Sequence, residues 1–334
     1  MGRRKVLSVR DLEISFATSS GSVSAIRGVR LDLYEGETLA IVGESGSGKS
    51  VTTKAILGIL SENGKIEKGS IQFTYERDGE EVTRDLTKLS DQEMQRHIRG
   101  KRIAMVFQDP MTSLDPTMTI GRQIIEGMQE HYHTSFHEAK EKAIELLELV
   151  EITDPEKRFK QYPHQLSGGM RQRVVIAIAL ACEPEVLICD EPTTALDTTT
   201  EAQILRLMQT LAVEAGIGII FISHNLRVIA QLCDRVMVMY AGKCVESATV
   251  EDLFNDPRHP YTIGLLMSLP QGKWHGELKA IEGQPPDLYE LPRGCAFNPR
   301  CKWAMRICGK RIPMISNVGN NHEYTCWLAK LEGL

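Results

Sequence analysis

The chain has 334 residues, of which 42% are hydrophobic and 25% charged, the composition of a globular protein with a sizeable core. A formal charge of −5 excludes the basic footprint that nucleic-acid binding needs, so nucleic acid is not an expected partner. The longest apolar run, 174–182, is far shorter than the roughly 18 residues of a membrane span, and the N-terminus lacks an apolar signal region. We therefore expect a cytosolic chain that meets a membrane only through a partner.

The N-terminal part of the chain predicts a first sheet. Residues 6–16 and 22–33 have the β-branched, alternating pattern of strands, and residues 19–21 between them have the composition of a turn. An apolar strand over 38–42 and a helical segment over 51–60 follow. The stretch between that strand and that helix is therefore a short connection that ends at a helix start.

That connection consists of Gly43, Glu44, Ser45, Gly46, Ser47, Gly48, Lys49 and Ser50. Glycines permit positive φ angles, so successive backbone N–H groups can turn toward a polyphosphate at the helix N-terminus. Lys49 would then reach the β- and γ-phosphates, and the Ser50 hydroxyl would bind Mg²⁺. Phe16 lies where its ring could stack on an adenine base, although a core phenylalanine fits its position equally well. The pattern predicts a nucleoside triphosphate site, the alternative being a Gly/Ser-rich turn before a helix.

The middle of the chain alternates buried strands with polar loops. A strand over 71–75 is followed by the charged residues 76–85, which predict a solvated hairpin tip. A strand over 103–107 ends at Gln108, whose amide can ligate Mg²⁺ and hydrogen-bond a water, and a polar loop able to shift comes next. From about residue 120 to 180, apolar residues recur at three- and four-residue intervals, which predicts a helical subdomain.

A second helix start with small residues lies inside this helical region. Ser167, Gly168 and Gly169, within the sequence Leu-Ser-Gly-Gly-Met, precede a strongly apolar helix. They offer a second anion-binding helix N-terminus, although a Ser N-cap with flexible glycines explains them as well. Two phosphate-ready helix starts and a single lysine-bearing loop fit a dimer in which each chain offers this element to the other chain's nucleotide.

Two carboxylates end the next buried strand. The run 186–191 begins with four apolar residues and closes with Asp190 and Glu191, which are costly to bury unless they are paired or bind a metal. We expect Asp190 to hold Mg²⁺ through water and Glu191 to polarise the attacking water, two basic partners being the structural alternative. Asp197 then opens a helix. His224 follows a further apolar strand, at an edge where ligands gather in open α/β sheets, so its imidazole is a candidate for contact with the γ-phosphate.

In this order and spacing, the motifs resemble those of the nucleotide-binding subunit of an ATP-binding cassette (ABC) transporter. The resemblance covers about residues 5–255. Its motifs are Walker A at 43–50, the Q-loop Gln108, the signature at 166–170, Walker B at 186–191, the D-loop Asp197 and the switch His224. The signature more often ends in glutamine where this chain has Met170, and tyrosine more often stacks on adenine where it has Phe16. Neither departure removes a catalytic group.

The resemblance implies a fold and a division of labour. The fold is an α/β P-loop NTPase cassette, with a RecA-like core, an antiparallel β subdomain and a helical subdomain. Two cassettes would form a head-to-tail ATPase dimer that holds two MgATP, each between Walker A of one chain and residues 167–169 of the other. Glu191, His224 and Gln108 would be catalytic, and Ser50, Gln108 and Asp190 would serve the Mg²⁺ ion.

The remaining residues, 256–334, form a predicted C-terminal extension behind a nucleotide-binding domain over 1–255. The extension carries Cys295, Cys301, Cys308 and Cys326. Four thiols in a short segment are suited to one tetrahedral thiolate site, while free thiols remain the alternative because paired C-x-x-C knuckles are absent. The other four cysteines, at 182, 189, 233 and 244, lie in apolar surroundings typical of inert core residues.

Two stretches of the extension resemble the C-terminal region of oligopeptide and dipeptide importer ATPases: His259-Pro260-Tyr261-Thr262, and the stretch from Gly294-Cys295 to Pro299-Arg300-Cys301. The stretch 111–116 after the Q-loop resembles the same ATPases. In that subfamily such cysteines hold a 4Fe-4S cluster. The resemblance therefore implies an iron–sulfur site as the first choice and a zinc site as the second.

The same resemblance implies the partners and the place of work. The chain would be an ATP-hydrolysing subunit at the cytoplasmic face of the cell membrane, energising an importer of oligopeptides or dipeptides, with nickel or another solute as the alternative cargo. Its partners would be a second ATPase subunit, usually a paralogue, two membrane permease subunits and, indirectly, an extracytoplasmic solute-binding protein. ABC ATPases of DNA repair need long heptad arms and those of translation carry two cassettes, and the sequence has neither pattern.

Overall fold

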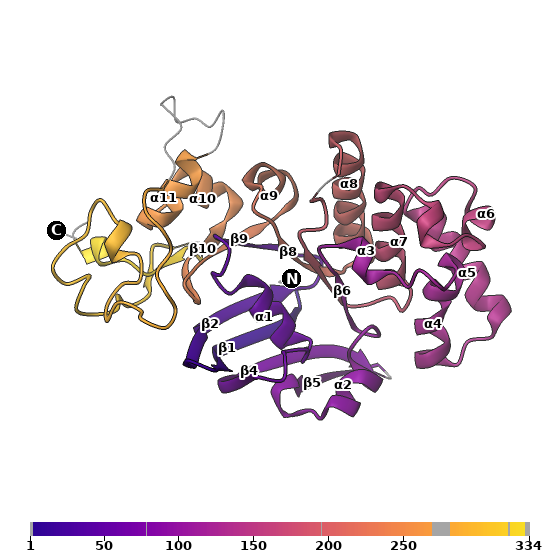
Figure 1. Cartoon of the computed structure of the whole chain (residues 1–334), viewed down its shortest axis with the longest axis horizontal. Coiled ribbons are helices and arrows are strands. Elements are labelled where there is room, and N and C mark those ends of the chain that lie inside the picture. The colour runs from indigo at the N-terminus through magenta and orange to yellow at the C-terminus, as the bar shows by residue number, and fades with distance from the viewer. Residues whose placement is uncertain (1–2, 78, 195, 269–280, 320, 331–334) are drawn as a thin grey trace. The chain divides into compact units, whose positions relative to one another are not determined.

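The computed structural model describes residues 3–77, 79–194, 196–268, 281–319 and 321–330 (Figure 1). The chain divides into two compact units whose segments alternate along the sequence. Unit 1 contains the described parts of Met1–Leu7, Leu33–Thr38 and Phe73–Ile222. Unit 2 contains the described parts of Ser8–Asp32, Leu39–Gln72 and Ser223–Leu334. Each unit is described by itself below.

Unit 1 is built on three parallel strands with helices. The strands are β6 (Ile103–Val106), β7 (Val186–Asp190) and β8 (Gly218–Ile222), in the order β6-β7-β8. Every residue of β7 and β8 is buried, which is why both strands are apolar without alternation. Their carboxyl ends lie at one edge of the sheet because β7 and β8 pair in parallel register from Val186–Gly218 to Asp190–Ile222.

The helices of unit 1 begin at the caps that the sequence provides. They are α2 (Asp91–His97), α3 (Pro110–Ser113), α4 (Ile120–Tyr132), α5 (Phe136–Leu149), α6 (Pro155–Phe159), α7 (Gly168–Leu180) and α8 (Thr198–Ala215), with 3-10 turns at Leu86–Lys88 and Pro163–Gln165. Ser135 and Glu138 form a capping box at α5, and Gly216 ends α8 in the left-handed conformation. Helices α4 to α7 pack together in the magenta and pink part of Figure 1, where the sequence pattern is helical.

Unit 2 contains a mixed sheet. Its strands are β3 (Thr38–Val42), β9 (Arg235–Tyr240), β10 (Lys243–Thr249), β11 (Ser316–Asn317) and β12 (Glu323–Tyr324). β3 pairs with β9 in parallel, while β10 pairs antiparallel with both β9 and β12. Short helices accompany them: α1 (Lys49–Ile56), α9 (Leu226–Leu232), α10 (Val250–Asn255) and α11 (Pro260–Met267), with 3-10 turns at Asn298–Arg300 and Trp327–Lys330. The helix expected over 51–60 ends early, because Gly58 takes a φ of +65° just beyond its C-cap.

A second sheet has four strands in the order β2-β1-β4-β5. They are β1 (Lys5–Thr18), β2 (Gly21–Tyr34), β4 (Gly64–Arg77) and β5 (Glu80–Asp85). The two N-terminal strands and the turn between them are confirmed. The hairpin tip expected over 76–85 is wrong in extent, because β4 runs to Arg77 and β5 begins at Glu80. A hydrogen bond of 2.9 Å between the hydroxyls of Thr74 and Thr83 joins the two strands across the pair.

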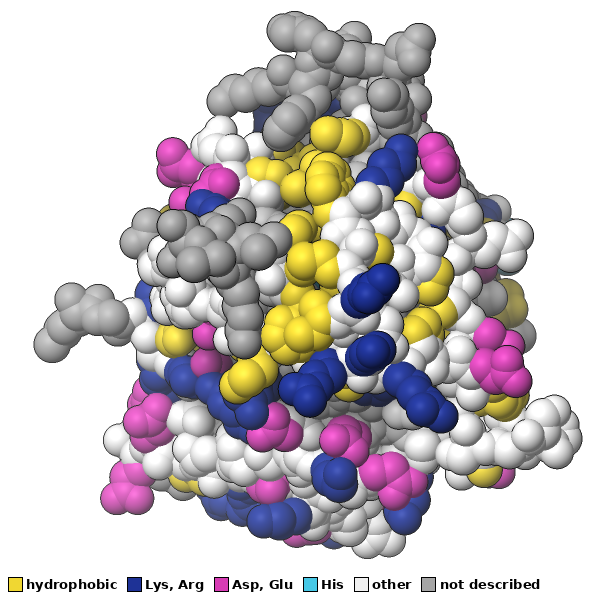
Figure 2. Space-filling view, turned by 90° about the vertical axis from the view of Figure 1, so that its left-hand side faces the viewer, with side chains coloured by type: hydrophobic (Ala, Val, Ile, Leu, Met, Phe, Trp, Pro, Cys, Tyr) yellow, Lys and Arg dark blue, Asp and Glu magenta, His cyan; other side chains and the backbone are white. Residues whose placement is uncertain are grey.

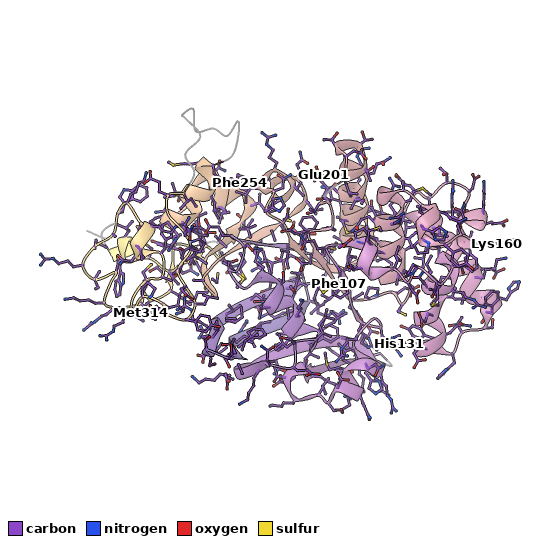
Figure 3. All side chains as sticks on the ribbon, viewed as in Figure 1. Phe107, His131, Lys160, Glu201, Phe254 and Met314 are labelled. Atoms are coloured by element: carbon purple, nitrogen blue, oxygen red, sulfur yellow. The ribbon has the colours of Figure 1, made fainter. Side chains whose placement is uncertain are left out.

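The C-terminal extension shares a hydrophobic core with the strands of unit 2. Tyr240 of β9, Tyr261 of α11 and Phe297 meet with ring centroids 4.6 to 5.4 Å apart. On its outer side, Met314 is 77% exposed, and Figure 3 labels it on this part of the chain. Figure 2 shows a band of hydrophobic side chains with lysine and arginine side chains beside it. Among the described residues, no helix combines the length and apolar character that crossing a bilayer demands.

Candidate functional site

The glycine-rich loop 43–50 of unit 2 connects β3 to α1. Gly43, Gly46 and Gly48 all have positive φ, at +150°, +77° and +103°. A side chain at Gly43 would collide with the carbonyl oxygen of Met239, and one at Gly48 would press on Ile26, so the loop lies too close to its neighbours for any other residue there. The glycines in the sequence therefore serve both the backbone angles and the close packing of the loop.

The polar groups of this loop are arranged around Lys49. Its ammonium donates to the carbonyl oxygens of Gly43 and Glu44 at 2.8 and 3.1 Å, so the lysine folds back over the loop. The hydroxyl of Ser47 is buried and has no hydrogen-bond partner among the described residues, and Gly48 precedes α1 as an N-cap without a side chain. Uncapped helix N–H groups, a buried hydroxyl and a lysine ammonium are groups that a polyphosphate can bind.

Phe16 and His224 belong to the same unit as this loop. Phe16 lies near the end of β1, where its half-buried ring faces Gly64 closely enough that a side chain at that glycine would clash. His224 is exposed and lies between β8 and α9, whose N-cap is Asn225.

Unit 1 brings two of the expected catalytic residues into contact. The amide nitrogen of Gln108 donates to the carboxylate of Glu191 at 2.9 Å, and the hydroxyl of Thr194 donates to the same oxygen at 3.1 Å. Glu191 also has a φ of +49°, a conformation that a residue with a side chain adopts at a cost, while its N–H donates to the carbonyl of Ile222 at 2.9 Å. The carboxylate is thus held in one orientation at the end of β7.

Asp190 is the other carboxylate of this strand end. It is the last residue of β7 and is 8% exposed. Phe107 and Gln108 are exposed beyond the end of β6, and Figure 3 labels Phe107 there. The parallel register of β6 with β7 brings Gln108 and the two carboxylates to the same edge of the sheet. An acceptor-only carboxylate pair and an amide at one sheet edge form a donor set suited to Mg²⁺ and water.

The signature and the D-loop both lie at helix N-termini of unit 1. The hydroxyl of Ser167 caps α7 by accepting from the N–H of Met170 at 3.3 Å, and Ser167 and Gly168 are exposed. Asp197 caps α8, accepting from the N–H groups of Thr199 and Thr200 and from the Thr200 hydroxyl. Those hydrogen bonds, that of Thr200 first, lower the pKa of Asp197. An ordinary N-cap thus accounts for the local role of each side chain, and the exposed backbone at 167–168 remains open to another molecule.

The four cysteines of the extension line one small cavity. Cys295, Cys301, Cys308 and Cys326 surround it together with His259, Phe297 and Trp327. All four are free thiols. Burial raises the pKa of Cys295 and Cys301, and raises that of Cys326 to about 11. Within the described ranges, no three His, Cys, Asp or Glu side chains are grouped so that they could hold a metal ion.

The thiols outside the extension lie in apolar surroundings, as expected. Cys182 and Cys189 are buried, and Cys233 and Cys244 are partly buried. Burial raises the pKa of Cys182 to about 11 and that of Cys244 to about 12, and raises that of Cys189 further. Thiols with such raised pKa values stay protonated and unreactive near neutral pH.

A buried carboxylate explains the His-Pro-Tyr-Thr stretch. Glu246 of β10 is fully buried and accepts from the N–H groups of Arg258 and His259 at 2.7 and 2.8 Å, and it lies 2.7 Å from Nε2 of His322. Burial acts to raise the pKa of Glu246, but the hydrogen bonds, that of His322 first, leave it lowered. Nδ1 of His259 accepts from the N–H of Tyr261 and caps α11. This network fastens the extension to β10.

Sequence reasoning assigned no role to three residues that hold the glycine-rich loop or the extension in place. Arg300 pairs with Glu44 of the loop, the hydroxyl of Tyr261 accepts from the Glu44 N–H, and Glu246 anchors the extension. The stretches that contain Arg300 and Tyr261 were recognisable only as a resemblance. No local periodicity or spacing indicates a contact between residues 217 or 256 positions apart.

Comparisons with known proteins agree with this geometry. Residues 26–194 match the family model described as ABC transporter, and residues 245–308 match that described as oligopeptide/dipeptide transporter, C-terminal region. The chain is 51% identical over 326 residues to the dipeptide transport ATP-binding protein DppD of Bacillus subtilis, covering 97% of this chain and 95% of that protein. The chain belongs to the ABC transporter family. It is thus an ABC-type ATPase.

Other relatives of this ABC ATPase extend the comparison. It is 54% identical over 327 residues to the oligopeptide transport ATP-binding protein OppD of Bacillus subtilis, covering 97% of this chain and 89% of that protein. A solved ATP-binding cassette, described as a dimer in a post-hydrolysis state with bound ADP and Pi, matches with a TM-score of 0.63 at 28% identity, over 73% of this chain and 98% of that one. The structure of cbiO1 from Clostridium perfringens matches with a TM-score of 0.62 at 28% identity, over 78% of this chain and 95% of that one. The expected α/β cassette fold is confirmed.

Proposed function

We propose that this ABC ATPase energises an importer of oligopeptides or dipeptides, working peripherally at the cytoplasmic face of the cell membrane on two permease subunits. The observation that carries the proposal is the C-terminal match over 245–308 to a region named for oligopeptide and dipeptide transporters. Two relatives whose alignments cover 97% of this chain, DppD and OppD, are named as dipeptide and oligopeptide transport proteins, and these names support the proposal. A solute-binding protein outside the membrane would deliver the peptide, and a nickel importer is the alternative.

A transport assay tests this proposal. A strain that lacks the gene for this chain is supplied with wild type or with Glu191→Gln, and uptake of a labelled tripeptide and of labelled nickel is measured. The proposal predicts peptide uptake with wild type alone. Peptide uptake that is independent of this chain, or restored nickel uptake in its place, would contradict the peptide assignment.

The proposed chemistry is hydrolysis of ATP to ADP and phosphate. The N–H groups of the loop 43–50 and Lys49 would bind the phosphates, with Phe16 beneath the adenine and His224 at the γ-phosphate. A bound Mg²⁺, served by Ser50, Gln108 and Asp190, would neutralise the charge that develops on the transferred phosphoryl group. Glu191 would accept a hydrogen bond from the attacking water, since Gln108 and Thr194 already fix its carboxylate.

A second cassette would complete the site. Ser167 and Gly168 are exposed at the start of α7, and Gly169 packs against Thr200. A solved cassette similar to this chain is described as a dimer, which supports the pairing of two cassettes. In the proposed pair, residues 167–169 of one chain would meet the loop 43–50 of the other. The D-loop Asp197, at the adjacent helix start, would lie at the same interface. The second cassette is proposed to be a paralogue.

The cysteines of the extension are proposed to hold a 4Fe-4S cluster, with zinc as the alternative. The four side chains line one cavity, which supports a shared group. One zinc ion with sulfur ligands at 2.3 Å requires sulfurs roughly 3.8 Å apart, whereas a cube of iron and sulfide holds its cysteines farther apart. Such a group would tie four points of the extension together.

Metal analysis decides between these groups. Protein purified without oxygen is predicted to carry about four iron and four sulfide per chain, with broad absorption near 400 nm that is lost in Cys301→Ser. Cys233→Ser, which lies outside the cavity, serves as the control and is predicted to keep the iron. A colourless protein with one zinc per chain would reverse the assignment.

The proposed boundary between a domain over 1–255 and an extension over 256–334 would be tested by limited proteolysis of the same preparation.

A further inference from the structure

The extension reaches the phosphate-binding loop through one buried arginine. Nη1 and Nη2 of Arg300 donate to the two carboxylate oxygens of Glu44 at 2.7 and 3.0 Å, which makes a two-pronged ion pair. The Arg300 side chain is 6% exposed and that of Glu44 is 26% exposed. The hydrogen bond to Glu44, ahead of every other cause, raises the pKa of Arg300, so the guanidinium remains charged throughout the accessible pH range.

Glu44 is held at three points, two of which come from the extension. Its carboxylate is paired with Arg300, and its N–H donates to the hydroxyl of Tyr261 at 2.9 Å. Its carbonyl oxygen accepts from Lys49 at 3.1 Å. Residue 44 is the second residue of the loop, so fixing its peptide groups on both sides fixes the direction in which the loop leaves β3.

The arginine is itself held by the chain around it. Its Nε donates to the carbonyl of Glu282 at 3.0 Å, Nη2 to that of Ile281 at 3.2 Å, and Nη1 to the hydroxyl of Tyr240 at 3.3 Å. A guanidinium whose donors are all directed by fixed acceptors has little freedom left to lose when nucleotide binds. The entropy of ordering the loop is therefore lost when the chain folds and not when nucleotide binds.

We propose that Arg300 is a positioning residue for ATP binding: through Glu44 it holds the phosphate-binding loop in its binding conformation, so the C-terminal extension is part of the nucleotide site. The arginine has a second effect, because it neutralises a carboxylate that stands in the loop where an anionic polyphosphate binds. Removing Arg300 leaves that carboxylate uncompensated, whereas removing Glu44 removes the charge as well. The proposal concerns ATP affinity and does not depend on the cargo or on the group that the cysteines hold.

A double-mutant cycle on the full chain tests the proposal. The dissociation constant for MgATP is measured for wild type, Arg300→Gln, Glu44→Gln and the double variant, each with its iron and zinc content determined. We predict that Arg300→Gln raises the constant about tenfold, Glu44→Gln about threefold, and the double variant no more than Glu44→Gln alone. The rate of hydrolysis at saturating ATP should change less than twofold in each, because no group at the reacting phosphate is altered.

The control is Lys302→Gln, which removes an exposed ion pair with Glu282 from the same segment. Its affinity for MgATP is predicted to match wild type. The alternative is that Arg300 acts only through its hydrogen bonds to the carbonyls of residues 281 and 282. The effects of the two single substitutions would then be independent, the double variant would lose affinity by their product, and the proposal would be overturned. An unchanged constant in Glu44→Gln overturns it as well. That variant leaves the extension intact, so it decides the question even if Arg300→Gln fails to fold.

Discussion

Two regions of this ATPase carry its candidate chemistry, and they are built in opposite ways. In the loop 43–50, the backbone at the glycines is proposed to bind the phosphates, and the side chain of Glu44 is paired with Arg300. At the end of β7, the backbone is a buried strand, and side chains such as Glu191 are proposed to carry the chemistry. Damage to the loop should therefore affect binding, while damage to the strand end should affect turnover.

The largest expected effect is at the strand end. Glu191→Gln keeps the shape of the side chain and removes the carboxylate that accepts from Gln108 and Thr194. ATP turnover of the assembled complex is predicted to fall by about a hundredfold or more, while ATP affinity stays within a few-fold of wild type. Steady-state hydrolysis and equilibrium binding on one preparation check this. Glu148→Gln, an exposed change on α5, is the matched control, and undiminished hydrolysis by Glu191→Gln would remove that residue from the proposed role.

The next effect is at the loop. Gly43→Ala would place a methyl group against the carbonyl oxygen of Met239, and the positive φ adds strain, so ATP binding is predicted to be lost. Gly28→Ala provides the comparison, because it carries similar strain at a φ of +82° with open space around the new methyl group. It should cost about 1–2 kcal/mol of unfolding free energy and leave ATP binding intact. Thermal unfolding and nucleotide titration distinguish the two, and normal binding by Gly43→Ala would contradict the close packing.

The signature residues 167–169 are expected to complete the nucleotide site of another chain. A change there should therefore affect hydrolysis by the assembled complex and spare ATP binding by the isolated chain. Gly169→Asp puts a carboxylate at the exposed helix start that would face a partner's nucleotide. Hydrolysis by the assembled complex is predicted to fall at least tenfold, while the isolated chain binds ATP normally. Loss of binding in the isolated chain would instead place this element in the chain's own site.

A smaller effect is expected at Phe16. Removing the ring in Phe16→Ala is predicted to weaken ATP binding about three- to tenfold, which corresponds to a stacking contribution of about 1 kcal/mol. Phe16→Tyr keeps the ring and should bind as wild type does. GTP binding measured beside ATP binding checks whether the loss follows the base. Equal affinities for the Ala and Tyr variants would assign Phe16 to the core alone.

How much of this could be predicted from the sequence differs between the two regions. The strand end is a local pattern: the apolar run of β7 and its two carboxylates are adjacent in the chain, so burial and chemistry are visible together. The tethers of the loop are not local. Arg300 and Glu44 are 256 residues apart, and the bond between them depends on how the extension packs on β9 and β10.

The elements that were predicted differ from those that were missed in how clearly their local sequence pattern shows. A strand with continuous apolar character, such as β7, was predicted within a residue. The charge of residues 80–85 concealed β5, because a strand with exposed side chains leaves little hydrophobic pattern to read. Gly58 was passed over as the end of α1, although a glycine just beyond a short helix is a stop signal that the sequence does offer.

The most direct test measures the dissociation constant for MgATP and the turnover rate together, on matched preparations of Glu191→Gln and Glu44→Gln. The account predicts a crossed result: Glu191→Gln loses turnover and keeps affinity, whereas Glu44→Gln loses affinity about threefold and keeps its turnover at saturating ATP. If both variants lose affinity and turnover in the same proportion, the division between a binding loop and a catalytic strand end is contradicted.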